Sequence, residues 1–395
     1  MAEQFLHGIE TIEIDDGTRP IRTAKSSVIG VVGTAPDADA ARFPLNTPVL
    51  LCGNPREAAA LKESGTLKDA ISAIFDQIGA MVVVVRVDKG ADAAATTTNV
   101  LGDATAGTGV HALLAAESVV KVAPRILCVP GFTGSRTGGK PNPVAAALKG
   151  IAEKMRAIAI VDGPNTTLDE ALAHRGEIAS DRIFIVDPAV KVWNEKAATI
   201  QPASARVAGM IARRDTEKGF WWSPSNQAVN GIVGLGRPIA FAMSDATCEA
   251  NLLNEKGIAT IVQKNGYRLW GNRTGSDNSP NPLWNFLSVR RTADMIYESV
   301  ENAFLWAMDR PMSANLILDI QESVRAYLRH LKAVGAILDG TCWLDPTLNS
   351  KEQLMAGKLF LDFDIEPPAP LEHLTFRAHR NNGYYEELVG QVLAA

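Results

Sequence analysis

Four consecutive valines, Val82 to Val85, lie at the centre of the apolar run 81–87 and constrain the fold more than any other feature. Such a run, without alternating polar positions, is typical of a strand that is covered on both faces. Further strands are predicted at residues 28–32, 125–129, 157–161 and 182–186, and helices at 67–78, 143–155 and 168–179. This alternation predicts an α/β fold with a parallel, doubly wound sheet and right-handed crossovers.

The segments outside this pattern are of several kinds. Residues 89–109 are small, polar and glycine-bearing, and indicate a loop or a domain boundary. Residues 215–290 are rich in glycine, asparagine and aromatic residues, and their strands are hard to place. Two helices are predicted at 291–309, before Pro311, and at 313–333, before Gly335. A hairpin-like pair of strands follows at 336–343 and 358–365.

Both ends of the chain carry apolar residues that have no evident partner nearby. Near the start, a short strand is predicted from apolar residues spaced among acids, namely Phe5, Ile9, Ile12 and Ile14. A lone terminal strand needs a partner sheet. At the other end, the proline-rich segment 367–370 forms a stiff connector to the extension 371–395.

Composition and charge argue against several classes of function. The formal net charge of −5 over 395 residues gives no basic field that would attract nucleic acid or anionic lipid. The four cysteines form no CxxC pair and lie near no histidine at ligand spacing, so neither a metal site nor a cofactor is expected. The first residues lack a secretory pattern, and no apolar run approaches about 18 residues, so the chain is expected to mature in a cytosol.

A search for catalytic groups finds only weak candidates. Asp162 and Asp187 follow predicted strands, at the edge where α/β enzymes bind substrates, and could form an acid and base pair. Turns after strands require Asp, Gly and Pro in any case, and this interpretation is favoured. No Walker A, GxGxxG, GxSxG or HExxH motif is complete. The chain is therefore predicted not to be an enzyme, with an α/β hydrolase or a nucleotide-dependent enzyme as the alternative.

The predicted helix 313–333 has two distinct faces. One face carries Arg325, Arg329 and Lys332 at four- and three-residue spacing. This basic stripe is either a solvated surface or a contact surface. The other face is an apolar stripe made of Leu316, Ile317, Ile320, Val324, Leu328 and Leu331.

Longer segments carry a resemblance to a known family. The segment LLNEKGIATIVQKNGYRLWGNRT at 252–274 resembles the sheath protein of myovirus-type contractile tails and of R-type pyocins. Further segments agree in order and spacing: RAIAIVDGPN at 156–165, GFWWSPSN at 219–226, LWAMDRPMS at 305–313 and AGKLFLDFDIEPPAPLEHL at 356–374. The resemblance covers nearly the whole chain, from about residue 7 to the C-terminus.

The resemblance implies a domain plan. A middle domain of subtilisin-like topology, without its protease site, is expected at 101–270, after an N-terminal arm at 1–20 and an α/β region at 21–100. An inner domain facing the tail tube is expected at 271–370, which makes the fold α+β overall, and a C-terminal arm at 371–395. The resemblance favours Arg325, Arg329 and Lys332 as tube-facing residues.

The resemblance also implies partners. Subunits are expected to stack helically as six-membered rings around the tail tube protein, and to meet baseplate and tail terminator proteins, without binding nucleic acid or membrane. Contraction would drive the tube through the target cell envelope, and the virion tail would be assembled in the host bacterial cytoplasm. A non-contractile self-assembling shell protein is a third interpretation that lacks the long-range order of sheath segments. Strand exchange between subunits is expected at Phe5, Ile9, Ile12, Ile14, Ile337, Leu338, Phe360, Leu361, Phe363, Tyr384, Leu388 and Val392.

Overall fold

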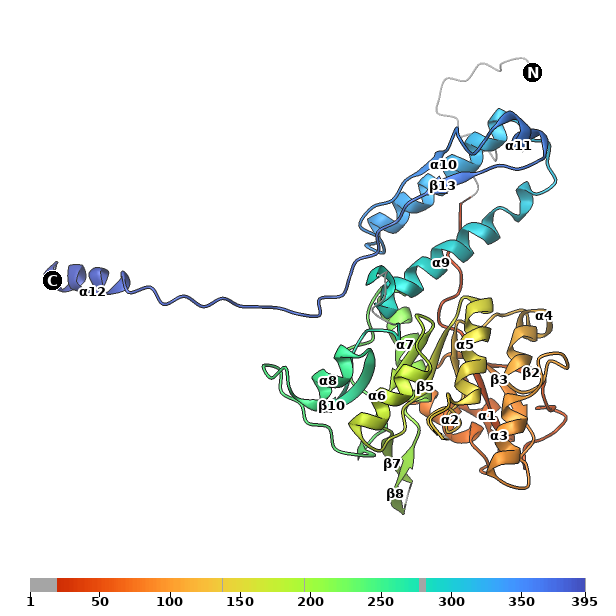
Figure 1. Ribbon diagram of the computed structural model, residues 1–395, viewed down its shortest axis with the longest axis horizontal. Coiled ribbons are helices and arrows are strands. Elements are labelled where there is room, and N and C mark those ends of the chain that lie inside the picture. The colour runs from red at the N-terminus through yellow and green to blue at the C-terminus, as the bar shows by residue number, and fades with distance from the viewer. Residues whose placement is uncertain (1–19, 137, 195, 277–281, 395) are drawn as a thin grey trace, which may run out of the picture.

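A computed structural model describes residues 20–136, 138–194, 196–276 and 282–394. Figure 1 shows a large body that contains the main sheet, a lobe above it, and an arm that extends away from both to the C-terminus. The predicted exchange residues Phe5, Ile9, Ile12 and Ile14 lie outside the described residues. No helix within the described ranges is long and apolar enough to cross a bilayer.

The body is built on an eight-stranded sheet with the order β11-β10-β6-β5-β4-β1-β3-β2. Its six inner strands are parallel, and the edge strands β2 and β11 are antiparallel to their neighbours, which confirms the predicted parallel sheet. The strands are β1 (Ile29–Thr34), β2 (Pro48–Cys52), β3 (Met81–Val87), β4 (Ile126–Cys128), β5 (Ile158–Asp162), β6 (Ile183–Val186), β10 (Ile258–Gln263) and β11 (Tyr267–Trp270).

Helices cover both faces of this sheet. Val82 and Val84 of β3 face the cluster that contains α2 and α7, and Val85 faces the opposite cluster, with α3, α5 and α6. The valine run is therefore buried from both sides, as predicted. The body helices are α1 (Pro55–Ala58), α2 (Leu67–Phe75), α3 (Ala93–Leu101), α4 (Ala116–Val120), α5 (Pro143–Met155), α6 (Leu168–Glu177), α7 (Ser204–Glu217) and α8 (Glu249–Glu255).

The expected boundary near residue 100 does not separate two sheets. Strands β1 to β3 and strands β4 to β6 belong to the same sheet, so residues on both sides of this position share one core. Residues 89–109, predicted to be a loop or a domain boundary, are not all loop, because they contain α3. The Asp92 side chain caps this helix by accepting a hydrogen bond from the Ala95 N–H at 2.7 Å.

A small hairpin projects from the end of the body that lies farthest from the lobe (Figure 1). Strands β7 (Val190–Asn194) and β8 (Ala197–Gln201) are antiparallel, and β9 (Gly234–Leu235) pairs with β7. The region 215–290, which sequence alone left unplaced, supplies β9, α8 and the two strands β10 and β11 at one edge of the main sheet.

The lobe has its own core. It contains α9 (Leu287–Ala303), α10 (Ala314–Ala333), β12 (Cys342–Leu344), α11 (Lys351–Met355) and β13 (Leu361–Phe363). The second predicted helix is confirmed by α10, which begins after Ser313 because the Ser313 Oγ accepts a hydrogen bond from the Leu316 N–H. The first begins and ends earlier than predicted. Ile21 and Phe220, from distant parts of the chain, pack against the lobe core.

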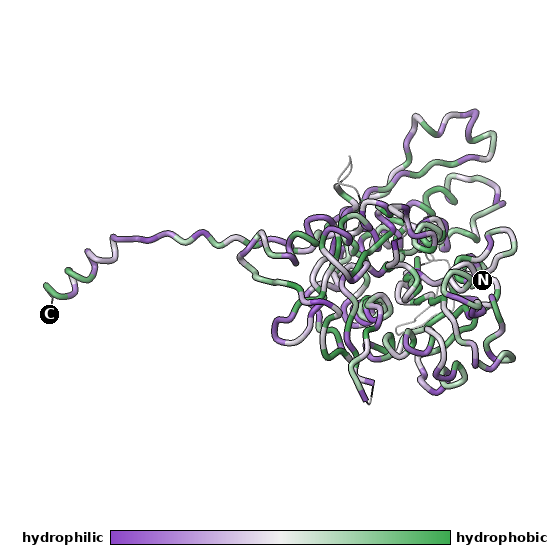
Figure 2. Tube along the Cα trace, turned by 60° about the horizontal axis from the view of Figure 1, so that its bottom comes forward, coloured by the Kyte–Doolittle hydropathy of each residue, from purple (hydrophilic) through white to green (hydrophobic). Residues whose placement is uncertain are grey.

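The arm after the lobe has no buried residue from 371 to 394 and ends in α12 (Tyr384–Leu393). Figure 2 shows hydrophobic residues at its far end, away from the body. The predicted exchange residues Tyr384, Leu388 and Val392 therefore lie on a helix in the subunit alone. Tyr384, Leu388 and Val392 are spaced four apart, which matches the helical period and places them on one face.

Candidate assembly surfaces and strand-end carboxylates

The lobe carries a two-stranded sheet with open edges. Strands β12 and β13 pair in antiparallel register, with Trp343 opposite Asp362, and no third strand joins them within the described residues. Unpaired strand edges present backbone N–H and C=O groups to any extended partner. Trp343 and Leu344 are exposed beside these edges. The sheet thus has the form of an acceptor for added strands.

The exchange residues predicted between positions 337 and 363 lie on or next to this sheet, and they differ in how far they are buried. Leu361 and Phe363 are half-buried in β13, and Phe360 is exposed just before it. The Leu338 side chain is exposed, while its N–H donates to the Glu366 carbonyl at 2.7 Å. Ile337 is buried in the lobe core. Its side chain packs within the subunit, so its part in exchange stays a prediction.

The arm is a second exposed surface. Leu371, Leu374 and Phe376 are exposed along its extended part, and both faces of α12 expose apolar side chains. The arm is tied to the body near its start by Arg273, which donates to the Glu372 carboxylate through Nε at 2.8 Å and Nη2 at 2.5 Å. A groove of about 1190 Å³ lies between this part of the arm and the body.

The basic stripe of α10 is less basic than the sequence predicts. Arg325 is half-buried and donates from Nε to the Cys342 carbonyl at 2.8 Å, which ties α10 to β12. Arg329 and Lys332 are exposed, but each pairs with an acid: Glu322 at 2.6 Å and Asp339 at 2.7 Å. The predicted apolar face is fully buried only at Val324, Leu328 and Leu331; Leu316, Ile317 and Ile320 are half-buried.

The two strand-end carboxylates are held by structural hydrogen bonds. Asp162 Oδ1 accepts from the Ser204 N–H at 2.8 Å, and its Oδ2 from the Ser204 hydroxyl at 2.7 Å. Burial raises the pKa of Asp162, and the hydrogen bonds from Ser204 oppose that rise. Asp187 Oδ2 accepts from Arg237 Nη2 at 2.5 Å, and its Oδ1 from the Asn165 N–H at 2.8 Å.

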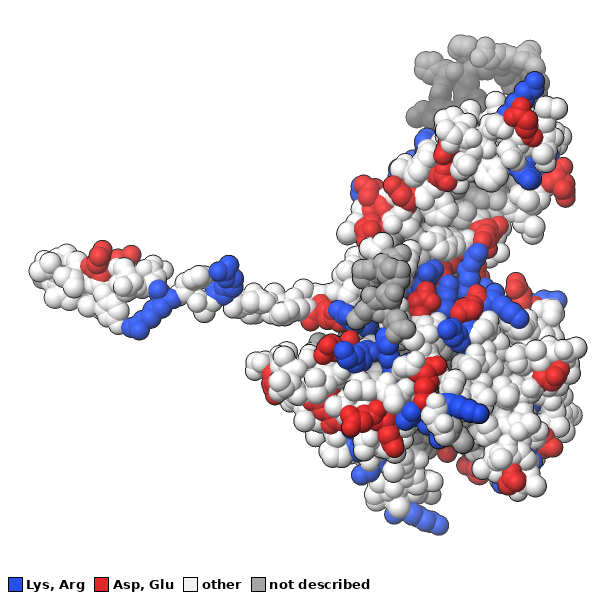
Figure 3. Space-filling view, in the orientation of Figure 1, with Lys and Arg blue, Asp and Glu red and all other residues white. Residues whose placement is uncertain are grey.

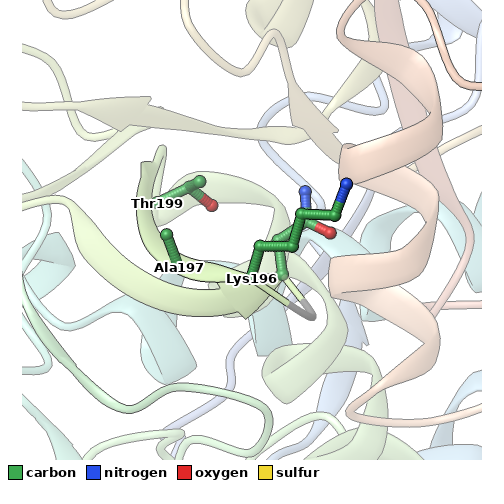
Figure 4. A pocket seen from close by; sticks show the side chains of 4 residues that line it. Lys196, Ala197 and Thr199 are labelled. Carbon is green, nitrogen blue, oxygen red and sulfur yellow. The ribbon is translucent and has the colours of Figure 1, made fainter.

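The backbone packs closely at these strand ends. A Cβ atom at Gly134 would lie 2.5 Å from the Gly163 carbonyl oxygen, and one at Gly163 would lie 2.5 Å from Cβ of Asp187. The hollow of about 320 Å³ beside the β7–β8 hairpin is lined by Lys196 together with Asn194, Ala197 and Thr199. Figure 4 shows the Lys196, Ala197 and Thr199 side chains along this hollow. No group of three or more metal-ligating side chains occurs in the ranges that the structure describes.

His174 on α6 is fully buried, and neither ring nitrogen has a hydrogen-bond partner among the described residues. The charges of Glu177, Arg136 and Asp187 act on its ring, and the Asp162 carbonyl favours the protonated form. Burial lowers the pKa of His174, and the Glu177 charge opposes that effect. Folding therefore favours the neutral form of His174 over the charged form.

Acidification is expected to destabilise the fold through His174. The unfolded chain takes up this proton near about pH 6.5, whereas the folded chain does so only at lower pH. The unfolded state then binds more protons between the two values, so the contribution to stability is lost as the pH falls through this window. Urea unfolding at about pH 7.5 and about pH 5.5 should show the loss. His174→Gln should reduce the pH slope, and an unchanged slope in this variant would assign the loss to other groups.

The fold and these surfaces combine an α/β body, a lobe with an open-edged sheet, and an exposed C-terminal arm. Comparisons with known proteins agree. Residues 105–275 match the family model of the phage tail sheath protein central domain, and residues 279–380 match that of the phage tail sheath C-terminal domain. The chain belongs to the phage tail sheath protein family.

Individual relatives extend over the full chain. A putative prophage major tail sheath protein of Pseudomonas aeruginosa (strain UCBPP-PA14) is 39% identical over 391 residues, covering 98% of this chain and 99% of the relative. The tail sheath protein of Escherichia phage P2 is 37% identical over 400 residues, covering 98% of each chain. These relatives are structural sheath proteins.

Solved structures share the fold. The anti-feeding prophage helical sheath in its contracted state matches with a TM-score of 0.70 and 19% identity, over 96% of this chain and 100% of the other. The PVC sheath complex, from an extracellular contractile injection system in its contracted state, matches with a TM-score of 0.67 and 16% identity, over 96% and 100%. The mixed α/β fold is thus that of contractile sheaths, as predicted.

Proposed function

We propose that this sheath protein acts without catalysis, by polymerising through its arms and then changing its packing. Copies of the chain stack helically as six-membered rings around a tube, between a baseplate and a terminator, and contraction drives the tube through the envelope of a target cell. Assembly takes place in the cytoplasm of the bacterial host. The observation that carries this proposal is the arm of residues 371–394, in which every residue is exposed although many are apolar.

The arm and the open-edged sheet complement each other chemically. An extended segment can add to an open edge by backbone hydrogen bonds, while apolar side chains fill pockets between strands. A helix as short as α12 is only marginally stable in water without packing, so it can unwind when it docks. We propose that Tyr384, Leu388 and Val392 dock beside β12 and β13 of a neighbour, with the N-terminal arm 1–20 as a further donor.

Energy for contraction is stored in the packing of the assembly. An extended sheath is a metastable arrangement built on the tube, and a contracted sheath is one of lower free energy. A difference of about a few kcal/mol per subunit suffices, because tethered rings convert cooperatively. No nucleotide, metal or cofactor takes part.

The lobe, within residues 271–370, is proposed to face the tube through the exposed side of α10. Exposed ion pairs contribute little to stability and are readily broken, which suits a grip that must be released. Arg329 and Lys332 can exchange Glu322 and Asp339 for acids of the tube. Arg325 is tied to Cys342 and is proposed to shape this surface from within.

Electron microscopy of the purified subunit, mixed with purified tube, tests the proposed function. Hollow, ridged cylinders are expected. Closed shells would favour a non-contractile shell protein, and uniform small oligomers would reopen the case for an enzyme. In the same assay, Arg329→Glu with Lys332→Glu should reduce assembly on the tube and leave the fold unchanged, whereas normal assembly of this variant, at low and raised salt, would eliminate α10 as the tube-contact surface.

A further inference from the structure

Three arginines form a row along one edge of the main sheet. Arg125, Arg156 and Arg182 lie one or two residues before β4, β5 and β6, which are adjacent parallel strands. The amino ends of adjacent parallel strands lie about 5 Å apart along one edge. We call Arg125, Arg156 and Arg182 the arginine row.

Helix α9 presents acids to this row. Asp294, Glu298 and Glu301 are four and three residues apart, so they share one face of the helix. We call them the acidic stripe. Arg125 Nη2 contacts Glu298 at 2.5 Å, Arg156 binds Glu301 through two contacts of 2.5 Å, and Arg182 pairs with Asp294.

The contact between lobe and body is charged: two of the three pairs are mostly buried, while the Arg156–Glu301 pair is more exposed. Figure 3 shows acidic and basic side chains gathered between the lobe and the body. The Arg182 side chain is 12% exposed and that of Asp294 1%. Arg291 of α9 adds a two-contact pair to Asp215 of α7, at 2.7 and 2.5 Å. By contrast, the apolar cores of lobe and body are separate clusters, and Leu287 at the start of α9 packs in the body core.

Directional pairs of this kind hold two parts at one angle more strictly than apolar contacts, which tolerate sliding. We propose that the arginine row and the acidic stripe are positioning residues that set the orientation of the lobe relative to the body, and that contraction of the sheath requires this orientation. The requirement of this orientation for contraction rests on the proposed function. The orientation of the lobe concerns the subunit alone and is testable without any sheath.

Hydrogen exchange of the purified full-length subunit tests whether these ion pairs hold the lobe in its orientation. In Glu298→Gln with Glu301→Gln, amides in the second half of α9 should exchange about tenfold faster, while those of β4, β5 and β6 stay protected. Glu322→Gln, which breaks the exposed pair with Arg329 on α10, is the matched control and should leave α9 unchanged. Unchanged α9 exchange in the double variant, or equal acceleration throughout the body, would overturn the proposal.

Swapping the charges of Arg125 and Glu298 distinguishes the effect of the ion pair from the effect of losing one acid. Arg125→Glu should accelerate exchange in α9, and adding Glu298→Arg should restore part of the protection because the pair is remade in reverse. Restoration is partial because Arg125 also donates to the Met155 carbonyl. If the double variant protects α9 no better than Arg125→Glu alone, the ion pair does not position α9.

Sheath assembly and contraction test whether contraction requires this orientation of the lobe. The variant Glu298→Gln with Glu301→Gln keeps its arms, so it should form sheaths, but a smaller fraction of them should contract under conditions that contract wild-type sheaths. Normal contraction together with faster α9 exchange would overturn the link to contraction. If the wild-type chain itself formed no sheath, the proposed function would fail, while the exchange results would still decide the role of the arginine row.

Discussion

Removing residues 383–395 is expected to leave a folded subunit that no longer builds continuous sheaths. Helix α12 lies within this segment and buries none of its residues against its own subunit, so its loss removes no contact from the cores. Its apolar face has a partner only when a neighbour supplies one. Circular dichroism and thermal melting should match the wild type, and microscopy should show short or absent cylinders.

A point variant keeps the length of the arm and tests the same contact. Leu388→Asp with Val392→Asp should abolish continuous sheaths nearly as well as the deletion, because docking would bury two unpaired charges. Glu386→Gln with Glu387→Gln, in the same helix, is the matched control and should still assemble. Contractile cylinders of normal length from the truncated chain would rule out the C-terminal arm as the link between subunits, whereas an unfolded truncated chain would place the arm in the subunit's own core.

Replacing Asp187 is expected to have the largest effect on the stability of the body. Its carboxylate is fully buried and binds Arg237 and the Asn165 N–H, so Asp187→Ala leaves a guanidinium only 12% exposed without one of its two acids. Breaking such a pair costs about 3 kcal/mol. Urea unfolding should show this loss, while Asp103→Ala, in an exposed turn, should show a much smaller one. A loss no greater than that of the control would show that the Asp187 pair contributes little.

The same carboxylates also test the alternative of an enzyme. Asp162→Asn with Asp187→Asn keeps the size of both side chains and removes their charge. Sheath assembly and contraction should persist wherever the double variant is folded, at some cost in stability because both groups are buried. Normal folding and assembly with loss of a chemical step would make the non-enzymatic proposal wrong.

Local patterns in the sequence determined much of the body and of α10. Unbroken apolar runs can be buried only between two layers, so Val82 to Val85 predicted a doubly covered sheet that the structure confirms. The predicted helix 313–333 agrees with α10 to within one residue at its start. The resemblance to tail sheath proteins, carried by long segments in order, predicted the family that the comparisons confirm. Its subtilisin-like detail for the middle domain stays a prediction.

Tertiary structure decided what depends on partners distant in sequence. Sequence spacing placed Arg325 with Arg329 and Lys332 on one face, but only the folded lobe brings Arg325 against the Cys342 carbonyl. The sequence alone does not determine the conformation of residues 384–393, because the same apolar residues can add to a neighbour's sheet as a strand or line one face of a helix. The three acids of α9 are four and three residues apart in the sequence, which places them on one face of the helix. Only the folded structure shows that this face contacts the arginines at the amino ends of β4, β5 and β6. Ion pairs between residues more than a hundred positions apart leave no local pattern, because their geometry is set by packing of the whole chain.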